Sequence, residues 1–257
     1  MQSILNQEIF KMTHKNSTWT SILALTVLTI LLAVSNLYQT KIQDVKFYFS
    51  SGFAGFQWLL LITIVISASF ITMEFEYGTI KQLVIQSSNR FTIFGTKIFL
   101  VACYSVFLHI FIIILTLGIK FLMFPSLNLN ENYMHQRSLI INLLANAGLD
   151  VFSSFLIISI VAFLAAFGSN SAISISVGLG VTFLGQGLSH LIIQSMIKQV
   201  PIVKWNPFNM LNLQEQFANA NYHYISHLTT GQLLIGDIIW TAIMLIAAAI
   251  VFSKRKI

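Results

Sequence analysis

The sequence predicts an all-α, polytopic membrane protein with six transmembrane helices, and three observations support this fold class. Of the 257 residues, 56% are hydrophobic and only 9% are charged, whereas a soluble globular protein carries about 25% charged residues on average. The mean hydropathy is correspondingly high, at +0.80. The apolar residues also gather in six long stretches. These features exclude soluble enzymes and disordered proteins.

Each apolar stretch is long enough to cross a bilayer, because about 20 helical residues span a hydrocarbon core about 30 Å thick. The predicted spans cover residues 19–38, 53–74, 97–121, 139–167, 171–194 and 232–253 of one transmembrane domain, residues 1–257. The small residues at positions 33–35 leave open the cleavage of the first stretch as a signal peptide. Against this alternative, the apolar run is longer than the core of a signal peptide.

An even number of spans places both chain ends on the same side of the membrane. Basic residues concentrate on the cytoplasmic side, most strongly beside a span, and Lys254, Arg255 and Lys256 directly follow the last one. We therefore expect both termini in the cytoplasm, although the bias along the whole chain is small. The net charge of +6 is interpreted in the same way, and no nucleic-acid partner is expected.

The segments outside the spans are predicted to form three further helical elements. The leader is predicted to be an amphipathic helix in the membrane interface, with apolar residues on one side of a helical wheel: Met1, Ile4, Leu5, Ile9 and Met12. Glu8 falls inside this apolar stripe, so a frayed hydrophilic tail is the alternative. Residues 75–96 are expected to hold a short cytoplasmic helix, and residues 195–231 an extracellular helical cap that Pro201 and Pro207 interrupt.

Catalytic and metal-binding motifs are missing from the sequence. It has no phosphate-binding loop of the Gly-x-x-x-x-Gly-Lys-Ser/Thr type and no His-Glu-x-x-His zinc motif. His223 and His227 are spaced for a shared helix face, but the absence of a neighbouring carboxylate or thiolate favours a surface role. The single Cys103 excludes an internal disulfide. We expect no catalytic residue, no metal site and no directly bound cofactor.

The strongest functional signal lies between the second and third spans. Two acidic residues precede a Gly-Thr pair, a short apolar segment follows, and Asn-Arg and Gly-Thr-Lys open the third span, as in Glu74, Glu76, Gly78, Thr79, Asn89, Arg90, Gly95, Thr96 and Lys97. This pattern resembles the first cytoplasmic loop of ABC-2-type transporter permeases. The six spans, the leader and the long last outer loop resemble that family along essentially the whole chain. One departure is that Gln86, Ser87 and Ser88 stand where the family often has a proline.

The resemblance implies that the short segment is a coupling helix, which docks on a separate ATPase subunit. The residues assigned to this coupling are Glu76, Gly78, Thr79, Leu83, Val84 and Arg90. Gly78 permits a sharp turn, Thr79 can cap the helix that follows, and Glu76 favours the positive end of its dipole. Leu83 and Val84 would offer an apolar surface to the ATPase. The alternative is an interfacial helix that only stabilises the loop.

The fifth span is rich in small residues, which allow helices to approach closely in a membrane. Ser176 and Gly180 are predicted to face a second permease near a cargo cavity, since the resemblance implies permeases that work in pairs. Gln186 and His190 lie one turn apart on a shared face of this span. Packing inside one bundle is the alternative for all four residues.

Two ionisable residues inside spans are expected to need a partner, because an unpaired charge is costly in a membrane. Asp150 of the fourth span is predicted to pair with His109 if the third and fourth spans touch. The pair would either line a translocation path or form an internal hydrogen bond.

The resemblance implies a bacterial ABC exporter in the cell membrane, in which two separate ATPase subunits carry ATP and magnesium. A second copy or a related permease would complete the complex, surrounded by membrane lipids. The cargo is expected to be an amphipathic antimicrobial or cytolytic peptide, which suits a chain with 22 phenylalanines and few charges. The rival interpretation is a non-transporting sensor or immunity scaffold that binds peptides. A membrane-embedded enzyme is disfavoured because catalytic residues are missing.

Overall fold

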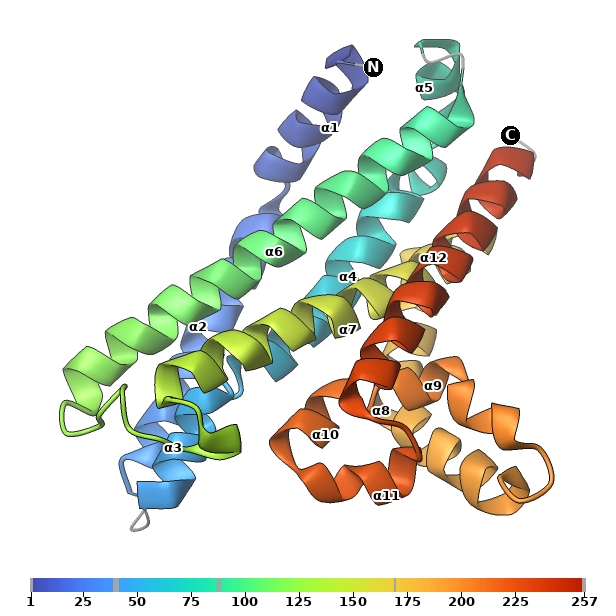
Figure 1. Cartoon of the computed structure of the whole chain (residues 1–257). Helices are drawn as coiled ribbons and strands as arrows, with labels where there is room; N and C mark the ends of the chain where they lie inside the picture. The colour runs from blue at the N-terminus through green and yellow to red at the C-terminus, as the bar shows by residue number, and fades with distance from the viewer. Residues whose placement is uncertain (1, 39–41, 87–88, 169, 256–257) are drawn as a thin grey trace.

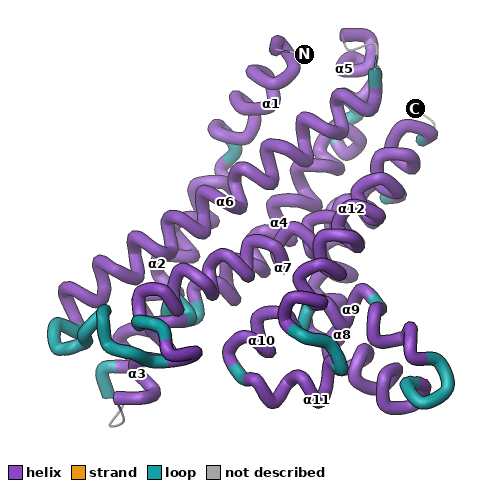
Figure 2. The backbone as a smooth tube through the Cα atoms, in the orientation of Figure 1, coloured by secondary structure: helices purple, strands orange, loops and turns teal. Residues whose placement is uncertain are grey.

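The computed structural model describes residues 2–38, 42–86, 89–168 and 170–255. Within these ranges the chain forms helices and loops without a β-strand, as Figure 2 shows; an isolated bridge joins Asn132 and Ser138. The predicted all-α class is therefore confirmed. The predicted end of the short helix at Ser87 and Ser88 lies outside the described residues.

Six helices in the described part are long and apolar enough to cross a membrane, which confirms the predicted number. They are α2 (Asn16–Asn36), α4 (Gly55–Glu76), α6 (Arg90–Met123), α7 (Leu139–Phe167), α8 (Ser171–Met196) and α12 (Thr230–Lys254). The third span begins at Arg90 and not at residue 97, because the side chain of Asn89 accepts a hydrogen bond from the backbone N–H of Phe91 and caps an earlier turn. A shorter helix, α3 (Ile42–Ser50), precedes α4.

The centre of the bundle is formed by α4 and α7, which pack against each other and against α6 and α8 (Figure 1). The most apolar stretch of α7 is 67% buried, whereas those of α8 and α12 are only 17% buried. The outer helices expose large aliphatic side chains, among them Ile235, Ile239 and Ile246 of α12. Such side chains suit contact with lipid, which is as apolar as they are.

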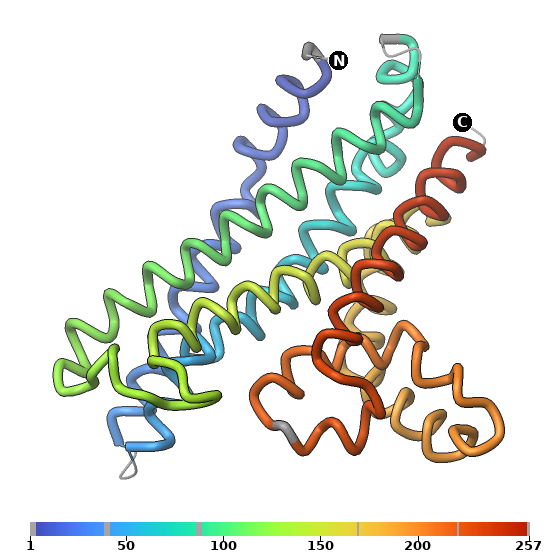
Figure 3. Tube along the Cα trace, in the orientation of Figure 1, coloured from blue at the N-terminus to red at the C-terminus, as the bar shows by residue number. Residues whose placement is uncertain are grey.

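The two ends of the bundle differ in what they carry (Figures 1 and 3). One end, here called the α5 end, holds α1 (Gln2–His14), α5 (Ile80–Gln86) and the C-terminal turn of α12. Both termini therefore share one end, as six spans require. The opposite end, the α10 end, holds η1 (Met134–Gln136), η2 (Pro201–Trp205), α9 (Pro207–Met210), α10 (Leu213–Ala218), η3 (Ala220–Tyr222) and α11 (His223–Ser226).

The short helices between α8 and α12 are joined by buried amide side chains. The Asn209 side-chain amide donates to the carbonyls of Lys204 at 2.6 Å and Ser226 at 2.9 Å. Pro201 and Pro207 are the first residues of η2 and α9, where a helix needs no backbone N–H. Each proline thus begins a new short helix, and for this reason the segment between α8 and α12 is divided into several helices. Its extracellular position stays a prediction.

Candidate coupling site

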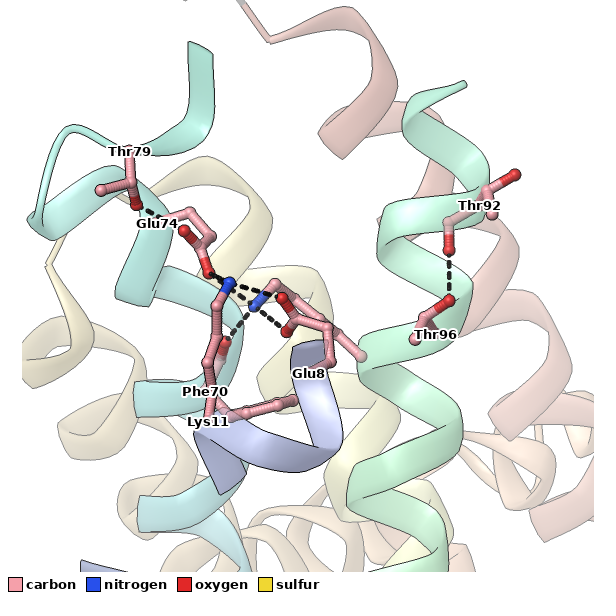
Figure 4. Close-up of polar contacts among 8 residues, drawn as sticks. Glu8, Lys11, Phe70, Glu74, Thr79, Thr92 and Thr96 are labelled. Atoms are coloured by element: carbon pink, nitrogen blue, oxygen red, sulfur yellow. Dashed lines mark hydrogen bonds and ion pairs between the residues drawn. The ribbon is translucent and has the colours of Figure 1, made fainter. Parts of the chain in front are cut away.

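Four charged side chains from three helices form an ion cluster at the α5 end (Figure 4). Glu8 and Lys11 come from α1 and Glu74 from α4, and Lys97 comes from α6. The Lys97 ammonium lies 2.7 Å from Glu8 Oε2 and 3.3 Å from Glu74 Oε1. The Lys11 ammonium lies 2.7 Å from one oxygen of each carboxylate. Two ammonium groups thus balance two carboxylates.

Burial makes this cluster a strong attachment for α1. The side chains of Glu8 and Lys97 are fully buried, and a buried charge is tolerated only where partners compensate for its lost hydration. Lys97 also donates to the carbonyl of Phe70 at 3.1 Å and lies 4.5 Å from the centre of its ring. Separating α1 from the bundle would break the Lys97–Glu8 and Lys11–Glu74 ion pairs and leave Lys97 only its longer contact with Glu74.

Lys11, which lies outside the spans, has a pKa that its two carboxylate partners raise. Burial disfavours its charged form, but the hydrogen bonds to Glu74 and Glu8 outweigh this effect and raise the pKa of Lys11 above its ordinary value. Lys11 therefore stays charged at every physiological pH, and the neutral balance of the cluster is kept.

The turn from α4 into α5 is made by Gly78, as predicted. Its φ of +67° lies in the left-handed region that glycine adopts without strain. Thr79 has another contact than the predicted one: its hydroxyl donates to Glu74 Oε2, and no capping bond from it to α5 is found in the described part of the chain. A carboxylate is the stronger acceptor for a hydroxyl because the bond is charge-assisted. The start of α5 is therefore tied directly to the ion cluster.

Glu76 and Arg90 also bind partners that the sequence did not reveal. Glu76 accepts a hydrogen bond from the backbone N–H of Ser171, so it stabilises the positive end of α8 and not of α5. The guanidinium of Arg90 donates to the carbonyls of Ser253 at 3.0 Å and Arg255 at 2.6 Å. Both side chains thus join helix ends within this chain, and neither extends freely toward a partner.

The apolar side of α5 faces the permease itself. Leu83 and Ile80 are each only 5% exposed and pack in a cluster with residues of α4, α6, α7 and α12. Val84 is partly buried against the same cluster. The bundle therefore covers Leu83, which is not part of a free apolar surface, whereas it covers Val84 only in part. Among the described residues from Glu76 to Ile85, the exposed ones are Glu76, Tyr77, Gly78, Lys81, Gln82 and Ile85.

The family model for the ABC-2 family transporter protein matches residues 4–185, which is more than two-thirds of the sequence. The chain belongs to the ABC-2 transporter family. The matched region includes the whole ion cluster, α5 and η1, but not the elements that follow α8, from η2 to α12. None of the curated proteins matches the sequence significantly.

Membership of the ABC-2 family makes the chain the membrane component of an ABC transporter. Such a component is not itself catalytic. Among the described residues, no group of three or more histidine, cysteine, aspartate or glutamate side chains is placed to hold a metal ion.

In this ABC-2 permease, the small residues of α8 divide between two faces. A Cβ atom at Gly178 would lie 2.9 Å from Val161 of α7, so this glycine serves packing inside the bundle. A Cβ atom at Gly180 would meet no atom within 4 Å, and Ser176 is exposed on the same side. The structure thus leaves Ser176 exposed and leaves open space beside Gly180.

Gln186 and His190, assigned to the same interface or cavity, are half-buried. The Gln186 amide donates to the carbonyl of Leu211 at 2.8 Å and so joins α8 to the α10 end. His190 Nδ1 is buried without a hydrogen-bond partner in the described part of the chain. Gln186 therefore already has an internal role, which its helical position alone could not reveal.

Asp150 and His109 form the pair that the sequence predicted, since α6 and α7 pack together. His109 Nε2 lies 2.9 Å from Asp150 Oδ2, and both side chains are buried. His109 Nδ1 lies 2.7 Å from the carbonyl of Ser105, which can only accept. Nδ1 therefore carries a hydrogen, and the contact with Asp150 must hold one further proton. The pair is neutral overall in either arrangement of that proton.

Proposed function

We propose that the chain is the permease subunit of an ATP-driven bacterial exporter and that an ATPase subunit docks on residues 76–90. The observation that carries the proposal is the joining of α5 to the spans through Glu74. This carboxylate contacts Thr79 at the start of α5 and the ammonium groups of Lys11 and Lys97. A force applied to α5 would therefore reach α4, α1 and α6 together.

The docking surface would be the exposed side of α5 and of the turn before it. Ile85 is 85% exposed and Tyr77 is 73% exposed, and Lys81 adds a positive charge between them. Leu83 then acts from inside, by holding α5 against the bundle. ATP and magnesium would bind to the ATPase, two copies of which would serve a pair of permeases. The α5 end, with both termini, would face the cytoplasm.

The proposed partner in the membrane is a second copy of the chain or a related permease. Its support is the open face of α8 around Ser176 and Gly180, beside large exposed side chains such as Leu184 and Leu188. Small residues among large ones allow close helix contact in a bilayer. The proposed cargo is an amphipathic antimicrobial or cytolytic peptide, which suits the apolar and sparsely charged spans.

The docking surface is tested by copurifying the tagged permease with its ATPase. Ile85→Asp should abolish or strongly reduce the recovered ATPase, because a charge would enter the apolar part of the contact. Ile202→Asp is the matched control, since Ile202 is 71% exposed at the α10 end. Equal recovery of the ATPase with Ile85→Asp and with the control would refute docking on this surface.

A further inference from the structure

A cavity of about 380 Å³ lies between α4, α7, α8 and the α9–α10 segment. Its volume falls at the lower end of the range for small-molecule sites, about 300–1,000 Å³. Its apolar wall includes Trp58, Phe183 and Ile157, and its polar wall includes Asp150, Ser153 and Glu215. The site therefore combines aromatic surface with carboxylates.

The charges around the cavity are unequal. Among the described residues, no lysine or arginine lines it. Asp150 is balanced, because the proton that it shares with His109 makes that pair neutral. Glu215 is different: it is half-buried and forms no ion pair in the described part of the chain. The cavity thus carries one uncompensated negative charge.

Two polar atoms of the lining are also left without partners. The hydroxyl of Ser153, which is only 7% exposed, has no hydrogen-bond partner in the described residues. The indole N–H of Trp58 is in the same state. Buried polar atoms are nearly always paired in folded proteins, so these two atoms are available to a molecule in the cavity. The Ser153 hydroxyl can accept a hydrogen bond from a cationic group, whereas the Trp58 N–H can only donate one.

We propose that this cavity binds the cationic group of an amphipathic organic molecule. Glu215 pairs with an ammonium or guanidinium group, and the Trp58 ring adds a cation–π contact beside it. Ser153 offers a further acceptor, and Phe183 and Ile157 cover the apolar part of the ligand. The volume admits one basic side chain with its neighbour, not a folded peptide.

The assignment of this cavity as a cargo site rests on the proposed export function. The cavity would receive a basic residue of the transported peptide. Binding itself needs only the permease, so it can be measured without the ATPase. A failure of the ATPase to copurify would refute the proposed export function. It would not affect the measured binding of a ligand to the permease.

The test uses dansylcadaverine, which joins a primary ammonium to an aromatic group, and its N-acetylated form, which is neutral. Binding to the purified permease in phosphatidylcholine nanodiscs is followed by fluorescence, with empty nanodiscs subtracted. The charged probe should bind saturably and at least about tenfold more tightly than the acetylated probe. Glu215→Gln should reduce its affinity by about tenfold or more, as expected for loss of a partly buried charge pair.

Asp44→Asn is the matched control, since Asp44 lies on α3, outside the cavity, and it should bind the probe as the wild type does. Asp150→Asn provides a second variant inside the site, and the melting temperature of every variant verifies folding. Equal affinity for the two probes would overturn the proposal. So would unchanged binding of the charged probe by a folded Glu215→Gln variant.

Discussion

Replacing Lys97 with methionine should destabilise the permease more than any other single lysine substitution on α5 or α6. The change keeps most of the side-chain length but removes an ammonium that lies 2.7 Å from Glu8, 3.3 Å from Glu74 and 3.1 Å from the Phe70 carbonyl. Two buried carboxylates would then share the single ammonium of Lys11. Breaking a buried ion pair by removing one partner costs about 3–5 kcal/mol.

This cost is measurable as a lower melting temperature of the purified permease. For a chain of this size, about 1 kcal/mol corresponds to about 2–4 °C, so Lys97→Met should lower the melting temperature by about 6–20 °C. Protease cleavage within α1 should rise in parallel, because α1 loses the buried ion pair between Glu8 and Lys97. Lys81→Met is the control: Lys81 is exposed on α5 and its loss should cost about 0.5 kcal/mol or less.

The double variant Glu8→Gln with Lys97→Met separates the charge effect from simple packing. It restores the balance, because Glu74 and Lys11 remain as one pair. The loss of unfolding free energy in the double variant should therefore be smaller than the sum of the losses in the two single variants, by a coupling energy of about 1–3 kcal/mol. Strictly additive effects, or a melting temperature of Lys97→Met equal to that of Lys81→Met, would refute the buried cluster.

Three further predictions follow from individual positions. Gly78→Ala should lower the unfolding free energy by about 1–2 kcal/mol, measured by thermal unfolding, since alanine is strained at a φ of +67° although its Cβ meets no atom. Gly180→Leu should keep the melting temperature but weaken pairing in cross-linking, whereas Gly178→Leu should lower the melting temperature because Val161 leaves no room. The stabilisation from Lys11 should be complete below its ordinary pKa of 10.5 and be lost only as pH rises past its higher folded pKa, so melting from neutral to mildly alkaline pH should not depend on Lys11.

The sequence predicted those features that depend on local pattern. The six spans follow from long apolar runs, and the turn at Gly78 follows from a residue that adopts positive φ at low cost. The pairing of Asp150 with His109 was predicted because an isolated charge inside a span needs a partner. In each case the structural feature depends on the properties of one residue or of one continuous stretch of sequence.

The features that the sequence did not predict depend on contacts between distant segments. Glu8 looked like a flaw in an apolar stripe, but it binds Lys97, which lies 89 residues away in the chain. An acidic residue inside an apolar stripe was the available signal, although the pattern could not name its partner. Leu83 presented the opposite problem: an apolar face predicts burial, but it does not say whether the bundle or another subunit covers it.

Docking of the ATPase at the exposed side of α5 can be measured by cross-linking from single cysteines. Cys103 is exposed and is first replaced by serine. Ile85→Cys at the α5 end and Ile202→Cys at the α10 end are then treated with a short bis-maleimide in membranes that contain the ATPase. Cross-linking of the ATPase from position 85 and not from position 202 is the predicted result. Cross-linking from position 202, or from neither position while the complex still copurifies, would contradict the account.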